Sequence, residues 1–198
     1  MTRPVRSGEG DSAARISVWR HPKPRGVAGR CIGRTDVPID PRKAKNLAHR
    51  IRTWARRQGA PRVVITSSLQ RGVDVGRCLA GWGWKHRVDT RLNEVDFGEW
   101  DGKRWEQIGA LAVEAWCLDF AHHAPGGGES VSALLLRCRQ FIDEWSPTGA
   151  LVVGHAGWIS AARWLQDAAD EVPTAALWPR AVGYGEMVAV KARPVPAA

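Results

Sequence analysis

The chain has 198 residues, of which 44% are hydrophobic, so it can form one sizeable core. We expect a single domain over residues 15–198, preceded by a disordered polar tail over residues 1–14. No apolar run approaches the ~20 residues of a membrane span and the tail lacks the apolar core of a signal peptide, which predicts a cytoplasmic protein with no membrane partner. The net charge of +9 is concentrated in residues 1–62, which hold 16 Lys and Arg against 4 Asp and Glu. This excess is typical of a solvated helix face, and it also suits an anionic substrate.

In the first half of the chain, the segment RISVWR at residues 15–20 is predicted to be a strand, and a Gly- and Pro-rich loop follows it. Asp40 and Pro41 are typical of a helix start, and Gly59 suits the end of that helix. Apolar residues keep the helical period between them. Further elements are predicted as a buried strand at 63–66, a helix at 69–79 and a short strand at 86–88.

In the second half, a helix is predicted over roughly 105–121 and a loop over HHAPGGGES. Ser130 is expected to cap a helix that reaches Trp145. A buried strand at 150–153, a helix ending near Asp167 and a last strand at 187–190 complete the chain. Strands that alternate with helices predict an α/β fold with a mainly parallel sheet.

Polar residues follow three of the predicted strands. His21 follows the first strand, Arg71 lies shortly after the second, and His155 follows the strand ALVVG. In open parallel sheets, ligands bind beyond the carboxyl ends of the strands. We therefore expect these side chains, together with Arg20, to meet at one edge of the sheet.

Two arginines and two histidines at one edge predict a cationic pocket for a phosphate group. Neighbouring cations disfavour the imidazolium form, so His21 would be neutral and nucleophilic. A leaving alkoxide needs a proton, and a carboxylic acid should therefore lie nearby. The segment LNEVDFGEWDG supplies candidates, and spacing alone does not choose among them: Glu94, Asp96, Glu99 and Asp101.

Six motifs in chain order resemble those of the histidine phosphatase superfamily, in its phosphoglycerate-mutase-like branch. WRHPKP resembles the Arg-His-Gly motif, TSSLQR the S-x-L-x-R motif, and VVGHAG the second histidine motif. The other three matches are GRCIGRTDVPIDP, LNEVDFGEWDG and APGGGES. The resemblance implies a three-layer α/β/α sandwich with a mainly parallel central sheet.

The same resemblance implies the roles of the site residues. His21 would carry the phosphoryl group, and Glu94 would act as the general acid, with Asp96 as the alternative. Arg20, Arg71 and His155 would hold the phosphoryl oxygens, and His155 would be counted with the catalytic residues. No cofactor is implied.

Within the superfamily, GRCIGRTDVP, FGEWDGKRW and PGGGES look most like α-ribazole phosphatases of cobalamin synthesis. The chain would then hydrolyse α-ribazole 5′-phosphate. The alternatives in the same class are a broad-specificity sugar or nucleotide phosphatase and a phosphoglycerate mutase-like enzyme. The alternative in another class is a non-catalytic protein that binds phosphate or nucleic acid.

The loop after His21 departs from the family pattern, because Pro22, Lys23 and Pro24 replace the usual Gly-Glu-Thr. Pro22 has no N–H to offer to a phosphate oxygen. Lys23 and Arg34 are predicted to add positive charge around the substrate. Trp100 and Trp105 lie in or beside the acidic motif and are predicted to contact a substrate ring.

No metal site is predicted. The four cysteines are widely spaced without a C-x-x-C pair, which favours reduced, buried thiols. His122 and His123 are adjacent, and adjacent histidines rarely ligate one ion. We expect a small phosphorylated substrate and no nucleic-acid partner. A homodimer is compatible with the sequence.

Overall fold

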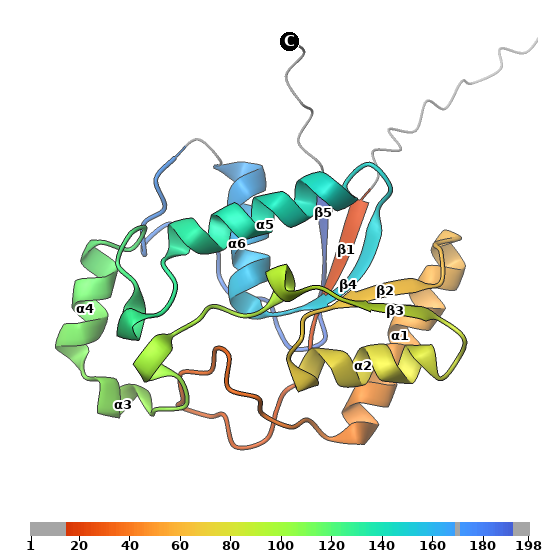
Figure 1. Ribbon diagram of the computed structural model, residues 1–198, viewed down its shortest axis with the longest axis horizontal. Coiled ribbons are helices and arrows are strands. Elements are labelled where there is room, and N and C mark those ends of the chain that lie inside the picture. The colour runs from red at the N-terminus through yellow and green to blue at the C-terminus, as the bar shows by residue number, and fades with distance from the viewer. Residues whose placement is uncertain (1–14, 169–170, 192–198) are drawn as a thin grey trace, which may run out of the picture.

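The core of the protein is a five-stranded sheet in which four strands are parallel (Figure 1). The structure is a computed structural model that describes residues 15–168 and 171–191, so the tail predicted at 1–14 lies outside the described residues. The strands lie in the order β3-β2-β4-β1-β5, and only β5 runs antiparallel to its neighbour. Their bounds are Arg15–Arg20 (β1), Val63–Thr66 (β2), Lys85–Val88 (β3), Ala150–Gly154 (β4) and Met187–Lys191 (β5).

Helices cover both faces of this sheet and so form the outer layers. On one face, α1 (Pro41–Gln58) and α2 (Gln70–Ala80) pack their apolar residues against alternate strand residues such as Val64 and Val153. On the other face, α5 (Val131–Trp145) and α6 (Ala156–Asp167) pack against Ile65 and Val152. The period-2 alternation of the strands thus supplies two separate cores. The predicted α/β fold with a mainly parallel sheet is confirmed.

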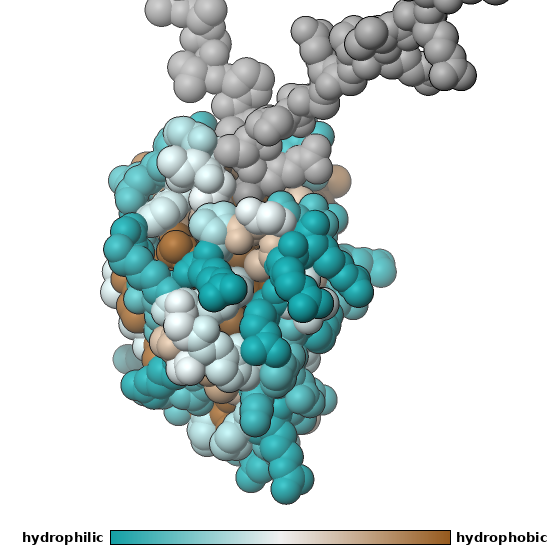
Figure 2. Space-filling view, turned by 90° about the vertical axis from the view of Figure 1, so that its right-hand side faces the viewer, coloured by the Kyte–Doolittle hydropathy of each residue, from teal (hydrophilic) through white to brown (hydrophobic). Residues whose placement is uncertain are grey.

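The ends of α1 match the expectation from the sequence. The Asp40 carboxylate accepts a hydrogen bond from the backbone N–H of Arg42 at 2.9 Å, and Gly59 ends the helix at a φ of 63°. The seven Lys and Arg side chains of α1 are all exposed, and the helix contains no Asp or Glu. The side of the molecule on which α1 lies carries mainly hydrophilic side chains (Figure 2). Much of the basic excess of the chain is therefore a solvated helix face.

The helix expected over 105–121 is two helices. It forms α3 (Trp105–Ile108) and α4 (Ala110–Leu118), because Gly109 between them has a φ of 86° that an α-helix cannot contain. Short 3₁₀ turns lie at Thr90–Leu92, Gly98–Trp100 and Pro125–Gly127. Over residues 15–168 and 171–191, none of the helices combines the length and the apolar character that a bilayer crossing requires.

Two loops pack backbone against backbone beside α3. A Cβ atom on Gly98 would overlap the carbonyl oxygen of Gly126, and one on Gly126 would overlap that of Phe97. A Cβ atom on Gly128 would likewise overlap the carbonyl oxygen of Asp96. The triple glycine therefore lets the loop at 126–128 lie directly on the loop at 96–98.

The sheet brings distant segments to one edge. The last residue of β1, Arg20, pairs with Gly154, the last residue of β4. Because β5 is antiparallel, its first residue, Met187, pairs with Trp19 near the end of β1. Residues that follow β1, β2 and β4 and residues that precede β5 consequently meet at the same edge.

Candidate active site

A cavity of about 240 Å³ lies at this edge of the sheet. It brings together four of the residues predicted from the sequence: Arg20, His21, Arg71 and Glu94. The His155 ring lies beside it, with its centroid 4.9 Å from that of His21. Much of the remaining lining is apolar and includes Pro24, Val27, Ile32, Phe97, Trp105 and Tyr184.

His21 is held at both its backbone and its ring. Its backbone N–H donates to the carbonyl oxygen of Gly154 at 3.0 Å, and Nδ1 lies 2.8 Å from the carbonyl oxygen of Pro22. A carbonyl oxygen only accepts, so Nδ1 carries the proton and Nε2 keeps its lone pair. Burial and the positive charges of Arg71 and Arg20 lower the pKa of His21 from 6.5 to about 3. The imidazole is therefore neutral at physiological pH.

His155 is completely buried and is also neutral. Burial and the nearby cationic groups lower its pKa well below the usual 6.5. Nδ1 accepts a hydrogen bond from Nε of Arg71 at 3.3 Å, and Nε2 lies 2.7 Å from the Ser67 hydroxyl. Because Nδ1 accepts, Nε2 carries the proton and donates it toward Ser67.

Arg71 is buried with only neutral acceptors around it. Its guanidinium donates to the carbonyl oxygens of Thr35 at 2.8 Å and Gly33 at 2.5 Å, besides the bond to His155. Among the described residues, no carboxylate forms an ion pair with it. A buried cation without a carboxylate partner is prepared to bind an anion.

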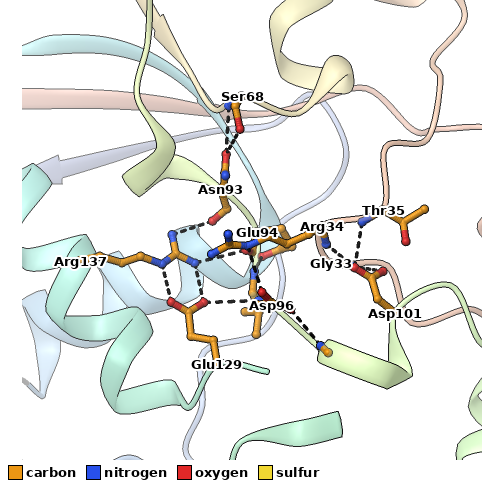
Figure 3. Close-up of polar contacts among 12 residues, drawn as sticks. Gly33, Arg34, Thr35, Ser68, Asn93, Glu94, Asp96, Asp101, Glu129 and Arg137 are labelled. Atoms are coloured by element: carbon orange, nitrogen blue, oxygen red, sulfur yellow. Dashed lines mark hydrogen bonds and ion pairs between the residues drawn. The ribbon is translucent and has the colours of Figure 1, made fainter. Parts of the chain in front are cut away.

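The loop that receives Arg71 is held by Asp101 (Figure 3). The Asp101 carboxylate accepts hydrogen bonds from the backbone N–H groups of Gly33 at 2.9 Å, Arg34 at 2.5 Å and Thr35 at 2.8 Å. The carbonyl groups of the same loop point to Arg71. Asp101 thus fixes the position of Arg71 through the backbone of residues 33–35.

Arg20 is held by the segment that precedes β5. Its Nη1 donates to the carbonyl oxygen of Val182 at 2.6 Å, and its guanidinium carbon lies 3.8 Å from the centroid of the Tyr184 ring. Its Nε is buried and has no hydrogen-bond partner among the described residues. Arg20 therefore keeps an unused donor and an unneutralised charge beside His21.

The two leading candidates for the acid, Glu94 and Asp96, lie in different places. The Glu94 carboxylate lines the cavity and accepts a hydrogen bond from the backbone N–H of Gly157 at 2.9 Å. Asp96 is not among the residues that line the cavity. Its Oδ1 accepts from the backbone N–H of Gly98 at 2.9 Å, and its Oδ2 faces Nε of Arg34 at 3.7 Å.

A partly buried ion pair holds the backbone around Glu94 (Figure 3). Arg137 of α5 pairs with both carboxylate oxygens of Glu129, at 2.6 and 2.8 Å. Its remaining N–H groups donate to three carbonyl oxygens: those of Arg91 and Asn93 at 2.7 Å each, and that of Glu94 at 3.3 Å. The Glu94 loop is thereby fixed to α5.

Among the residues predicted to bind the organic part of a substrate, Trp105 lines the cavity. Lys23 is exposed, and Arg34 is exposed beside Asp96; neither is among the lining residues. Trp100 packs edge to face on Trp116, with ring centroids 6.0 Å apart, and does not line the cavity either. The structure thus brings one of the four to the predicted pocket.

Among the described residues, no three His, Cys, Asp or Glu side chains lie close enough together to hold a metal ion. The four cysteines are free thiols. Cys31 and Cys138 are buried as expected, whereas Cys117 is exposed.

Sequence reasoning did not identify Tyr184 and Phe97, which both line the cavity. Tyr184 is the only tyrosine in the chain and stands between Gly183 and Gly185, just before β5. A lone aromatic residue between two glycines next to a strand end was the available signal. The rule that ligands bind beyond the carboxyl ends of strands does not reach it, because it precedes β5.

Comparison with known proteins agrees with the motifs. The model of the histidine phosphatase superfamily (branch 1) matches residues 16–194. A glucosyl-3-phosphoglycerate phosphatase from Mycobacterium tuberculosis is 30% identical over 190 residues, covering 87% of this chain and 82% of that protein.

Solved structures show the same architecture. The native structure of a mycobacterial glucosyl-3-phosphoglycerate phosphatase superposes with a TM-score of 0.69 at 27% identity, covering 89% of each chain. The α-ribazole phosphatase from Shigella flexneri gives a TM-score of 0.70 at 25% identity, covering 88% of this chain and 89% of that one. The chain therefore belongs to the histidine phosphatase superfamily, branch 1, and is a phosphoric monoester hydrolase.

Proposed function

We propose that the protein hydrolyses phosphate monoesters through a phosphohistidine formed on Nε2 of His21. The observation that carries this proposal is the hydrogen bond from Nδ1 of His21 to the carbonyl oxygen of Pro22, at 2.8 Å. It leaves the lone pair on Nε2 of a neutral imidazole, in a cavity that also contains Arg20, Arg71 and Glu94. A neutral imidazole beside two cations is a suitable nucleophile for a phosphorus atom.

In the first step, Arg20 and Arg71 hold the phosphoryl oxygens while Nε2 of His21 attacks phosphorus, and His155 joins them when its Nε2–H turns from the Ser67 hydroxyl to a phosphoryl oxygen. The bond between phosphorus and the ester oxygen breaks, and the leaving oxygen takes a proton from Glu94. In the second step, Glu94 removes a proton from water, which attacks the phosphohistidine. The P–N bond breaks and inorganic phosphate leaves, so that Nε2 regains its lone pair.

Glu94 is preferred to Asp96 as the acid because its carboxylate lines the same cavity as His21. The Asp96 carboxylate is directed to the Gly98 backbone and to Arg34. A general acid must reach the leaving oxygen at hydrogen-bond distance, which Glu94 can do from its present loop position.

The substrate that we favour is α-ribazole 5′-phosphate, a nucleoside-like monophosphate. Support comes from the apolar and aromatic lining, in which Trp105, Phe97 and Tyr184 could contact a ring. One solved structural relative is an α-ribazole phosphatase. An apolar lining offers little to a small, highly charged ester such as 3-phosphoglycerate.

A second candidate substrate is glucosyl-3-phosphoglycerate, the compound in the names of the curated relatives. That ester carries a carboxylate in addition to its phosphate. Arg30 lines the cavity as a further cation, with one N–H donating to the carbonyl oxygen of Gly102 at 2.8 Å, and could receive this carboxylate.

Two experiments test the proposal. After rapid quenching with labelled substrate, the label should be acid-labile and base-stable, and absent in His21→Ala; a stable phosphoserine at Ser67 or Ser68 would overturn the mechanism. Chelators should leave turnover intact. Turnover also separates an enzyme from a non-catalytic phosphate-binding protein, which would bind phosphate esters and release no phosphate.

The second experiment compares kcat/KM for α-ribazole 5′-phosphate, glucosyl-3-phosphoglycerate, 3-phosphoglycerate and ribose 5-phosphate at fixed salt. A stacked ring contributes ~1–3 kcal/mol, so α-ribazole 5′-phosphate should exceed ribose 5-phosphate by roughly tenfold or more. A higher kcat/KM for glucosyl-3-phosphoglycerate would establish the second candidate instead.

A further inference from the structure

We infer that Tyr184 is a positioning residue, which fixes the Arg20 guanidinium beside His21 for the phosphoryl group. This inference rests on the proposed function of the cavity and adds a residue from a segment that none of the sequence motifs covers. An arginine that binds phosphate must be held firmly in the site and must also keep its positive charge.

The contact between the two side chains is direct. The guanidinium carbon of Arg20 lies 3.8 Å from the centroid of the Tyr184 ring, well within the ~6 Å range of a cation–π interaction. Nη1 of Arg20 donates to the carbonyl oxygen of Val182 at 2.6 Å, two residues before the tyrosine. Both contacts thus come from one short segment ahead of β5.

The backbone around Tyr184 is itself fixed to Arg20. The N–H of Arg20 donates to the carbonyl oxygen of Glu186 at 3.0 Å, and the N–H of Gly185 donates to the carbonyl oxygen of Arg20 at 3.0 Å. Gly185 has a φ of 75°, a conformation that favours glycine and turns the chain at this point. The tyrosine ring is therefore tied to the residue whose side chain it covers.

The chemical nature of the partner explains the arrangement. A carboxylate beside Arg20 would hold the guanidinium but would also repel a phosphate dianion. The face of an aromatic ring attracts the cation while leaving its net charge and its edge donors available. Among the described residues the guanidinium forms one hydrogen bond, from Nη1 to the carbonyl oxygen of Val182, so further N–H groups remain for a phosphoryl oxygen.

Tyr184 also faces the site in which the phosphoryl group would lie. It lines the cavity, its ring centroid is 5.6 Å from that of His21, and 38% of its surface is exposed. An anion bound between His21 and Arg20 would therefore lie against the tyrosine ring.

The first test compares vanadate affinity in Tyr184→Leu, Tyr184→Phe and the wild type. Leucine removes the aromatic face, and vanadate binding should weaken by about 5- to 30-fold, with a matching fall in kcat/KM. Phenylalanine keeps the face and should restore most of this loss. Leu177→Ala serves as the control, because Leu177 is exposed on the same connecting segment and does not line the cavity.

A double-mutant cycle tests whether Tyr184 acts through Arg20. In an Arg20→Ala background, Tyr184→Leu should weaken vanadate binding by less than about twofold, because the arginine that the ring positions is gone. A loss equal to that in the wild-type background would overturn the inference. Equal affinity in Tyr184→Leu and the wild type would do the same.

The third test needs no variant, because Tyr184 is the only tyrosine in the chain. Tetranitromethane should nitrate it in the intact protein, and saturating vanadate should slow that nitration severalfold, as followed by the mass of the Tyr184 peptide. Unchanged nitration while vanadate inhibits turnover would overturn the inference and leave the proposed function intact. Failure of vanadate to bind, together with the absence of a label on His21, would overturn the proposed function itself.

Discussion

The carboxylate of Glu94 lies against the first turn of α6, where the backbone N–H of Gly157 is 2.9 Å from Oε1 and 3.2 Å from Oε2. These contacts fix the direction in which the side chain points. A Cβ atom on residue 157 would lie 2.5 Å from Oε1, so glycine at this position lets the carboxylate lie where it does. The second histidine motif therefore supplies both His155 and the space that Glu94 occupies.

Replacement of Glu94 by Gln removes the acid and preserves the size of the side chain. An alkoxide leaving group must be protonated, whereas p-nitrophenolate leaves with little help from a proton. We therefore expect the transfer of the phosphoryl group from alkyl esters to slow by about 10²–10⁴, and the transfer from aryl esters to slow far less. Single-turnover rates measure both. If Asp96→Asn slows alkyl esters more than aryl esters, and Glu94→Gln slows both equally, then Asp96 is the general acid.

Gly157→Ala is expected to give a weaker form of the same contrast, because the added methyl group displaces the Glu94 carboxylate without removing it. Alkyl phosphates should again be affected more than aryl phosphates in single-turnover measurements. Loss of both substrates to the same extent would mean that the substitution disturbs α6 rather than the acid.

Asp101→Asn is expected to loosen the loop that receives Arg71. An amide oxygen accepts less strongly than a carboxylate oxygen from the N–H groups of residues 33–35, so vanadate affinity should fall by roughly tenfold and the free energy of unfolding by about 1–3 kcal/mol. Isothermal titration and urea unfolding measure the two effects. Asp143→Asn, at an exposed position of α5, is the matched control and should leave both unchanged.

Arg137→Met is expected to lower the free energy of unfolding by about 2–4 kcal/mol, because it leaves the partly buried Glu129 without its partner and removes donors from three carbonyl groups. The pair is partly buried, with 14% and 12% of the two side chains exposed. Adding Glu129→Leu should recover part of the loss. Arg139→Met, exposed on the same helix, should change stability by less than about 0.5 kcal/mol.

The two buried histidines should make the protein less stable in mild acid. In the unfolded chain they bind protons below about pH 6.5, whereas His21 in the folded protein stays neutral down to about pH 3. The unfolded state thus binds more protons between these values, and stability should fall as the pH falls. Each histidine contributes up to about 1.4 kcal/mol per pH unit. Urea unfolding at pH 7.5, 6 and 5 measures how the free energy of unfolding changes with pH. His21→Gln should reduce this change. A stability that is the same at all three pH values would contradict the prediction.

Much of the fold and part of the site followed from local patterns. Period-2 and period-3.6 patterns located the strands and most helices, and the caps at Asp40, Gly59 and Ser130 set several ends. The prediction of one helix over 105–121 was wrong, because apolar content alone does not reveal that Gly109 adopts a positive φ.

The convergence of Arg20, His21, Arg71 and His155 was predictable because carboxyl ends of parallel strands share an edge. Tyr184 was not, because β5 is antiparallel and brings its beginning to that edge. Long-range hydrogen bonds also escaped prediction. The bonds from Asp101 to residues 33–35 join segments more than 60 positions apart, and no local pattern encodes them.

The packing of the loop at 126–128 on the loop at 96–98 affects how mutational data on this protein should be interpreted. Side chains at Gly98, Gly126 or Gly128 would meet main-chain carbonyl oxygens, which cannot move aside without shifting the segment that leads to Glu94. In a saturation screen scored by phosphatase activity, these glycines should therefore tolerate as few substitutions as His21. Scoring cellular abundance alongside activity should separate them, because His21 variants should lose activity at near-normal abundance whereas the glycine variants should lose both.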